Sequence, residues 1–257
     1  MLDAGLLNPN PRPPGADPQI AQAVRRLRVA LVRCEIEPGH FVAEHEIAER
    51  FGLGRAAVRV ALTTLEVAGL VVRCPRQGWR ATPITENLVR AVTDGRSRLE
   101  GVLAAVRPTA ADRSRLDQLA GIVAALGDRS DRQSVLTVRA ADRQIRDLLA
   151  ARSDELTRRW LSEVWDHRDR IVCVLDRAGI AIASDDRAPL IAALAKGDQK
   201  TAAAWFKRDI ARDARLIAAG IAHAGILGAV SSARSARRRR PRNVKITDRE
   251  VTYQKQE

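Results

Sequence analysis

The apolar residues between positions 17 and 82 recur at intervals of three and four, the spacing of one helix face, in three separate stretches. We therefore predict three helices, beginning at about residues 18, 44 and 55. Their apolar stripes are Ile20, Val24, Leu27 and Leu31 in the first, Ile47, Ala48 and Phe51 in the second, and Val58, Ala61, Leu62 and Leu65 in the third. Glu37-Pro38-Gly39 ends the first helix, and Gly52-Leu53-Gly54 makes a tight turn between the other two.

Two short strands are predicted after the third helix. Gly69 is placed as a helix C-cap, and the segments 70–74 and 79–82 carry the residue types of strands. Pro75-Arg76-Gln77-Gly78 joins them as a hairpin turn. Three helices and a hairpin, with a glycine turn between the second and third helices, form the winged helix-turn-helix pattern. In that fold the third helix enters the major groove of DNA, and the hairpin, called the wing, can reach neighbouring phosphates.

Residues 83–226 show helical periodicity and almost no strand signal. The expected helices are 85–106, 110–126, 132–151, 154–177, 185–196 and 199–222. Residues that suit a helix N-cap stand near several of their starts: Thr109, Asp154, Ser184 and Asp198. Six helices with short joints predict an all-α antiparallel bundle. The predicted fold class is therefore mainly α, with a winged helix-turn-helix domain at 17–82 and a helical bundle at 83–226.

The two ends of the chain lack this periodicity. Four prolines between positions 9 and 14 exclude a regular helix there, so residues 1–16 are predicted to be a flexible N-terminal segment. The run Arg237-Arg238-Arg239-Arg240-Pro241-Arg242 lies in residues 227–257, which are predicted to be a basic disordered tail. No apolar run is long enough to span a membrane, and Met1–Gly15 lacks the features of a signal peptide. We expect a cytoplasmic protein without a membrane partner.

Charge and motif content narrow the function further. The 44 Lys and Arg residues exceed the 31 Asp and Glu residues by 13, which favours a polyanionic partner. Aromatic residues make up only 3%, so the chain has few side chains on which single-stranded bases could stack. The three cysteines are far apart and form no CxxC motif, so no zinc knuckle or disulfide framework is predicted. No nucleophile–base pair or glycine-rich phosphate loop is visible, so we expect neither an enzyme nor a cofactor.

A long string of motif residues lies at fixed spacing between positions 27 and 82. It consists of Glu37-Pro38-Gly39, Glu46-Ile47-Ala48-Glu49-Arg50-Phe51-Gly52, Arg55, Val58-Arg59, Ala61-Leu62, Leu65-Glu66, Gly69-Leu70-Val71 and Gly78. This string closely resembles the DNA-binding domain of GntR-type transcriptional regulators. Residues 83–226 resemble the FCD effector domain, named for the C-terminal half of the regulator FadR, through Arg96-Ser97-Arg98-Leu99-Glu100 and Ala193-Leu194-Ala195-Lys196-Gly197-Asp198. The resemblance implies a homodimer that binds a palindromic double-stranded operator, usually as a repressor relieved by a small organic acid.

Six residues are candidates for contact with DNA: Arg55, Arg59, His45, Arg76, Gln77 and Gly78. The first two are four positions apart and so share one face at the start of the third helix. Arginine suits a bidentate contact with guanine, and the resemblance implies base or phosphate contact at both positions. The resemblance also implies that His45 faces the DNA backbone. The other three form the wing tip, where a glycine is explained by a positive φ or a close approach to DNA. Ordinary solvated arginines remain the alternative for the helix pair.

Many FCD domains hold a divalent metal with one Asp and three His. Here Asp142 matches the Asp, whereas Arg146, Arg187 and Asp209 stand at the positions of the three His. A guanidinium group cannot ligate a metal, so we predict no metal. Two interpretations stay open. The arginines, with Arg96 as a further contact, could bind an anionic ligand directly, or the charges could cancel in a buried ion-pair network.

The leading interpretation is a sequence-specific transcriptional regulator. The alternative is a basic architectural DNA-binding protein, or a regulator that has lost effector control. A footprint on DNA separates regulation from architecture, because only a regulator protects a discrete palindrome.

Overall fold

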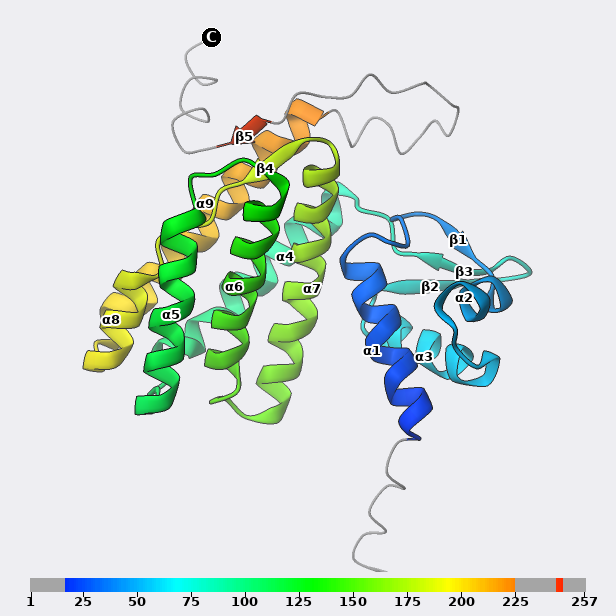
Figure 1. Cartoon of the computed structure of the whole chain (residues 1–257), viewed down its shortest axis with the longest axis horizontal. Coiled ribbons are helices and arrows are strands. Elements are labelled where there is room, and N and C mark those ends of the chain that lie inside the picture. The colour runs from blue at the N-terminus through cyan, green and yellow to red at the C-terminus, as the bar shows by residue number, and fades with distance from the viewer. Residues whose placement is uncertain (1–16, 225–243, 247–257) are drawn as a thin grey trace, which may run out of the picture. The chain divides into compact units, whose positions relative to one another are not determined.

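The computed structural model describes residues 17–224 and 244–246 of the 257-residue chain. It divides into two units, Met1–Pro83 and Ile84–Glu257, which are described separately below. Helices dominate the described residues, which confirms the predicted mainly α fold class (Figure 1). None of the described helices is both long and apolar enough to cross a membrane.

The N-terminal unit contains three helices and a small antiparallel sheet. The helices are α1 (Pro18–Val32), α2 (Glu44–Phe51) and α3 (Arg55–Val67). The strands are β1 (Phe41–Val42), β2 (Val71–Cys74) and β3 (Gly78–Ala81), in the order β1-β3-β2. The helices begin where expected and β2 and β3 form the expected hairpin, whereas β1 was missed because two residues carry no periodic signal.

A single apolar cluster holds this unit together. It joins Leu27 and Leu31 of α1, Leu62 and Leu65 of α3, and Trp79 of β3, all of which are almost fully buried. The N-terminus of α1 is capped by Asp17, whose side chain accepts a hydrogen bond from the backbone N–H of Gln19. The core therefore fixes which face of each helix points to solvent.

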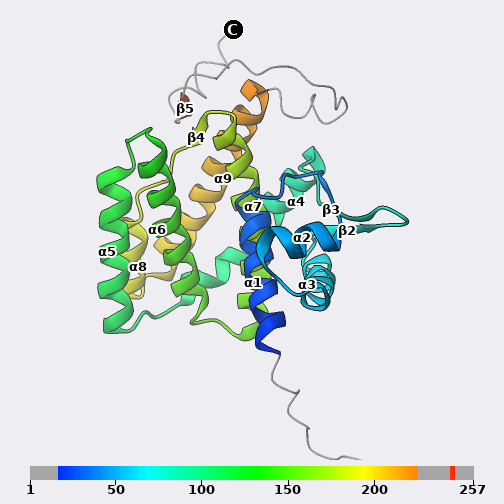
Figure 2. The same ribbon diagram turned by 45° about the vertical axis from the view of Figure 1, so that its right-hand side comes forward.

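The C-terminal unit contains six α-helices among the described residues. They are α4 (Glu86–Leu99), α5 (Ala110–Leu126), α6 (Arg132–Ala150), α7 (Glu155–Arg177), α8 (Ala188–Lys196) and α9 (Gln199–Ala224). A 3₁₀ helix, η2 (Glu100–Ala105), follows α4, and the strands β4 (Ile180–Ile182) and β5 (Val244–Ile246) pair in parallel. Figure 1 shows α5, α6 and α7 in a row, and α5 and α6 are also neighbours in Figure 2.

Two apolar clusters form the core of this unit, and a layer of buried charges separates them along the helices. On α7, Trp165 belongs to the first cluster and Ile171 to the second. On α9, Phe206 belongs to the first cluster and Leu216 to the second. Between these positions lie the buried charges Asp166, Arg168 and Arg170 on α7, and Asp209 and Asp213 on α9. On both α7 and α9, buried charged residues therefore interrupt the apolar stripe between the two clusters.

Four expectations for this unit are wrong. The helix expected over 85–106 ends at Leu99 and continues as a 3₁₀ helix, in which Glu100 turns inward to charged partners. The helix expected over 185–196 begins at Ala188 and not after Ser184, because Asp186 accepts the N–H of Ala188. Strand β4 was not expected, and β5 lies within the tail that was predicted to be disordered.

Both strands are three residues long, too short for a periodic signal, and their pairing joins segments that are distant in the chain. The rest of the predicted tail, together with the predicted N-terminal segment 1–16, lies outside the described residues.

Candidate nucleic-acid interface and the charged layer of the bundle

The third helix, α3, exposes its charged side to solvent because its apolar side packs into the core of the N-terminal unit. Val58 and Leu62 are fully buried, whereas Arg55 and Arg59 lie on the exposed face. Gly52 ends α2 in the left-handed conformation, with φ of 63°, which turns the chain sharply before α3 begins. The two arginines are thus one helical turn apart at the start of an exposed helix, as the sequence predicted.

The side chain of Arg59 is held by a carboxylate of the neighbouring helix. Its Nε–H donates to Oε2 of Glu44 over 2.9 Å. The other oxygen of Glu44, Oε1, accepts from the indole Nε1–H of Trp79 over 3.3 Å. Partial burial acts to raise the pKa of Glu44, but the hydrogen bonds from Arg59 and Trp79 lower it below its ordinary value. Glu44 is therefore ionised at neutral pH.

His45 and the wing tip are exposed. His45 lies on α2, beside Glu44 in the chain. At the wing tip, Arg76 and Gly78 both have a positive φ, 63° and 83° respectively, with Gln77 between them. A Cβ on Gly78 would stand 3.2 Å from the carbonyl oxygen of Val42, so the fold itself favours glycine there and strains any other residue.

Three residues that contact Arg59 or one another beside this helix were not predicted from the sequence: Glu44, Arg73 and Trp79. Arg73 of β2 lies opposite Trp79 of β3, and its guanidinium stacks over the indole ring at 4.6 Å. Its backbone N–H donates to Oε1 of Glu66 over 3.1 Å. The hairpin register, which pairs Arg73 with Trp79, is the signal that could have identified this contact.

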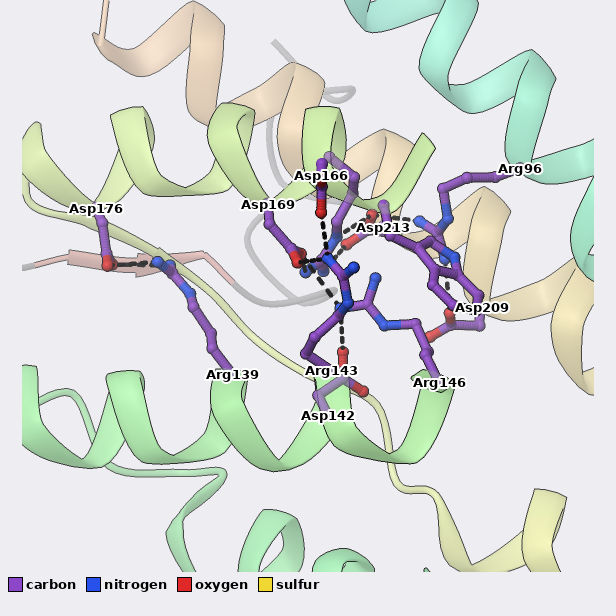
Figure 3. A network of polar contacts seen from close by, with 12 residues as sticks. Arg96, Arg139, Asp142, Arg143, Arg146, Asp166, Asp169, Asp176, Asp209 and Asp213 are labelled. Carbon is purple, nitrogen blue, oxygen red and sulfur yellow. Dashed lines mark hydrogen bonds and ion pairs between the residues drawn. The ribbon is translucent and has the colours of Figure 1, made fainter. Parts of the chain in front are cut away.

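The five candidate ligand residues of the bundle are all buried and lie together. Arg146 contacts Asp142 over 3.0 Å, and Arg187 contacts the other oxygen of Asp142 over 2.5 Å. Arg187 also lies 3.5 Å from Asp209, which in turn contacts Arg96 over 3.1 Å. The four helical members come from three different helices, so the bundle brings together residues that are more than a hundred positions apart (Figure 3).

Further charged residues, which the sequence analysis did not select, complete this layer. Glu100 receives two hydrogen bonds from Arg96 and one from Trp165. Asp213 joins Arg96, at 2.6 Å, to Arg168, at 2.7 Å. In Figure 3, Arg143 and Arg146 rise from α6 toward the α7 carboxylates. A charge every three to four positions inside an apolar stripe was the available signal, as in Asp209 and Asp213 on α9.

The buried charges of the described residues cancel. Five arginines are buried, Arg96, Arg146, Arg168, Arg170 and Arg187, and so are five acids, Glu100, Asp142, Asp166, Asp209 and Asp213. A neutral layer needs no external anion to balance its charge, although a few of its hydrogen-bond donors have no acceptor. The N–H groups at Nε and Nη1 of Arg146, Nε of Arg187 and Nε1 of Trp205 are buried without a hydrogen-bond acceptor.

The carboxyl groups of this layer differ in how strongly they are held as anions. Burial acts to raise the pKa of Asp142, but the charges of Arg187 and Arg146 outweigh it and hold that pKa well below its usual range. The pKa of Asp213 is likewise low, because Arg168 and Arg96 outweigh burial. In contrast, burial dominates at Asp209 and raises its pKa above the ordinary value.

The residues of this layer do not fit a divalent metal. Both oxygens of Asp142 are in contact with guanidinium groups, which cannot ligate a metal. Among the described residues, no group of three or more His, Cys, Asp or Glu is placed to hold a metal ion. A cavity of about 270 Å³ does occur in this unit, but it lies between α5 and α8 and is lined by none of the five candidate residues.

Comparisons with known proteins find sequence similarity within the N-terminal unit. The family model described as "Bacterial regulatory proteins, gntR family" matches residues 19–80. A curated relative, the uncharacterized HTH-type transcriptional regulator YieP of Escherichia coli K12, is 41% identical over 59 residues. That match covers 23% of this chain and 26% of the relative, so it spans about a quarter of either protein.

Solved structures share the fold over most of the chain. The structure of E. coli McbR/YncC aligns with a TM-score of 0.62 and 17% identity, covering 80% of this chain and 97% of that one. A putative transcriptional regulator GntR from Rhodococcus sp. RHA1 aligns with a TM-score of 0.59 and 20% identity, covering 78% and 98%. At these identities the likeness establishes the fold alone, a winged helix-turn-helix domain followed by a helical domain.

Proposed function

We propose that this chain, whose residues 19–80 match the gntR family, is a sequence-specific DNA-binding transcriptional regulator. The observation that carries the proposal is the exposed pair Arg55 and Arg59 at the start of α3, one turn apart above a fully buried stripe. An arginine in this position can reach guanine O6 and N7 in the major groove. His45 and the wing tip, Arg76 to Gly78, supply contacts to phosphates on either side.

The regulator acts as a homodimer on a palindromic operator. A single reading helix covers only a few base pairs, and two helices related by a twofold axis read two half-sites about one DNA turn apart. The helical unit, which resembles the FCD type, provides the dimer contact in this proposal. Occupation of the operator then blocks transcription, so that the protein is a repressor.

The bundle is the part of this regulator that would receive a small carboxylate effector. Buried guanidinium N–H groups of Arg146 and Arg187 that lack an acceptor support this assignment, because a carboxylate oxygen would satisfy them. Arg96, Asp142 and Asp209 form the rest of the same contact set.

A second candidate function, a regulator without effector control, is favoured by a different observation. Each guanidinium group of Arg96, Arg146 and Arg187 already contacts at least one aspartate, and the buried charges cancel. A carboxylate ligand would have to displace one of these partners and leave it buried without a cation, which is costly. Calorimetry with a panel of small organic acids separates the two functions. Binding that also releases DNA supports effector control, and no binding by any acid supports the second function.

The DNA-binding proposal is tested by selecting duplexes from a random DNA library with the full-length protein. The expected result is a discrete palindrome that is protected in a footprint. The variant Arg55→Ala/Arg59→Ala is expected to lose this selectivity. The matched control, Arg158→Ala/Arg208→Ala, removes the same charge from exposed positions of α7 and α9 and should keep it. Uniform protection of all duplexes would instead indicate an architectural protein.

A further inference from the structure

A carboxylate lies beside one of the arginines that the proposed function assigns to DNA. Glu44 stands at the start of α2, with Arg59 and Arg73 as its charged neighbours, and its side chain is 26% exposed. A negative charge at this place repels the phosphates of any duplex that approaches, whatever its sequence. Glu44 therefore lowers the affinity for DNA in general, and its presence calls for another role.

The geometry of Glu44 indicates that role. Its Oε2 accepts the Nε–H of Arg59 over 2.9 Å, while the guanidinium side chain of Arg59 stays 70% exposed. A contact through Nε leaves the two terminal nitrogens, Nη1 and Nη2, on the outer edge of the guanidinium. Those two nitrogens can together form a bidentate contact with O6 and N7 of guanine. The contact thus fixes the side chain without using the atoms that read a base.

Glu44 is itself held in place from the other side. Its Oε1 accepts the indole N–H of Trp79, and Trp79 is a core residue of β3 with only 2% of its surface exposed. The carboxylate therefore links a rigid part of the wing to the flexible side chain of Arg59. Orienting Arg59 before DNA binds reduces the conformational entropy that is lost when the base contact forms.

We propose that Glu44 is a positioning residue that presents Arg59 for base recognition and so determines selectivity at one base pair of each operator half-site. This inference rests on the proposed function and adds a residue to it. Without Glu44, Arg59 could turn toward a phosphate, which raises affinity for any duplex and reduces the preference for one base.

Two substitutions of Glu44 separate orientation from charge. Glu44→Met and Glu44→Gln both remove one negative charge at similar volume, but only glutamine keeps an oxygen that accepts the Nε–H of Arg59. Both variants should therefore bind non-specific DNA more tightly than the wild type, and by a similar factor. A complete bidentate contact contributes about 5- to 150-fold to base selectivity. Selectivity at the base read by Arg59 should fall about tenfold in Glu44→Met, which lies within that range, and less than about threefold in Glu44→Gln, which lies below it.

The experiment uses the full-length protein and the operator that the wild type selects from random duplexes. Arg59→Ala first identifies the base pair whose preference depends on Arg59. Binding of both Glu44 variants to the operator, and to operators changed at that base pair, is then measured over a range of salt concentrations. In Glu44→Met the logarithm of affinity should fall more steeply with the logarithm of salt concentration, by about 0.9 for each additional phosphate that the protein neutralises. Thermal unfolding of each variant checks that its N-terminal unit is folded.

Three results would overturn the inference and leave the proposed function intact. In the first, Arg59→Ala changes no base preference. In the second, Glu44→Met keeps the full preference of the wild type. In the third, Glu44→Met and Glu44→Gln lose the same preference, which would assign the effect to charge alone. If the wild type selects no discrete site, the proposed function itself fails.

Discussion

The charged layer of the bundle makes a quantitative prediction for Asp142, which is 1% exposed. Asp142→Asn removes one charge with little change of volume and leaves the buried arginines in excess. Removing one partner of a buried ion pair costs about 3–5 kcal/mol, because the remaining charge is poorly solvated. Arg146 keeps Asp169 at 3.2 Å and Arg187 keeps Asp209 at 3.5 Å. We therefore expect the lower end of that range, a loss of about 3 kcal/mol in the free energy of unfolding.

Asp209→Asn is the matched control, since it makes the same chemical change in the same layer. Arg96 would keep Glu100 at 2.5 Å and Asp213 at 2.6 Å, and Arg187 would keep Asp142. Burial already raises the pKa of Asp209 above its ordinary value, so the folded protein favours the charged form of this side chain less than water does. A carboxylate whose pKa is raised on folding does not gain stability from its charge at neutral pH, so losing that charge should cost less than about 1 kcal/mol.

Urea unfolding of the full-length variants at pH 7, followed by far-ultraviolet circular dichroism, tests this difference. The two variants should differ by about 2 kcal/mol in the free energy of unfolding, and the slope of that free energy is about 2 kcal/mol per molar urea. The urea midpoint of the helical unit should therefore be about 1 M lower in Asp142→Asn than in Asp209→Asn. The reasoning is refuted if the two variants lose the same stability, or if Asp209→Asn is the less stable one.

Three other predictions concern the wing glycine, acid stability and metal binding. Gly78 has a φ of 83°, so Gly78→Ala should lower the free energy of unfolding of the N-terminal unit by about 1–2 kcal/mol. In the control, Gly101→Ala, the new methyl group meets open space and should not destabilise the C-terminal unit. Thermal unfolding measures both variants. The low pKa values of Asp142 and Asp213 give stability that is present above about pH 4, the range of an unfolded aspartate, and is lost as pH falls through the lower folded values. Urea midpoints should therefore hardly change from about pH 7 to 5 and fall below about pH 4, and a midpoint that rises on acidification would contradict this. Excess zinc or manganese should leave the melting temperature of the helical unit unchanged, because guanidinium groups contact both oxygens of Asp142; a rise would indicate a metal site.

The elements of the N-terminal unit could be predicted from the sequence because their signals are local. A helix face depends on residues three and four positions apart, so the buried stripe of α3 also placed Arg55 and Arg59 on its opposite, exposed side. The hairpin and its turn could be recognised for the same reason. The link from Arg59 through Glu44 to Trp79 could not, because it joins residues 15 and 35 positions apart.

The bundle shows the same division. By its periodicity, the sequence predicted helices over residues 83–226, and its resemblance to the FCD domain marked Asp142, Arg146, Arg187 and Asp209 as one set of charged positions. It left open whether these charges bind a ligand or one another. The tertiary structure alone decided that each of them contacts an opposite charge, with Glu100, Arg168 and Asp213 as further members. The physical reason is that periodicity records which side of a helix is buried, whereas the partner of a buried charge depends on how distant helices pack against it.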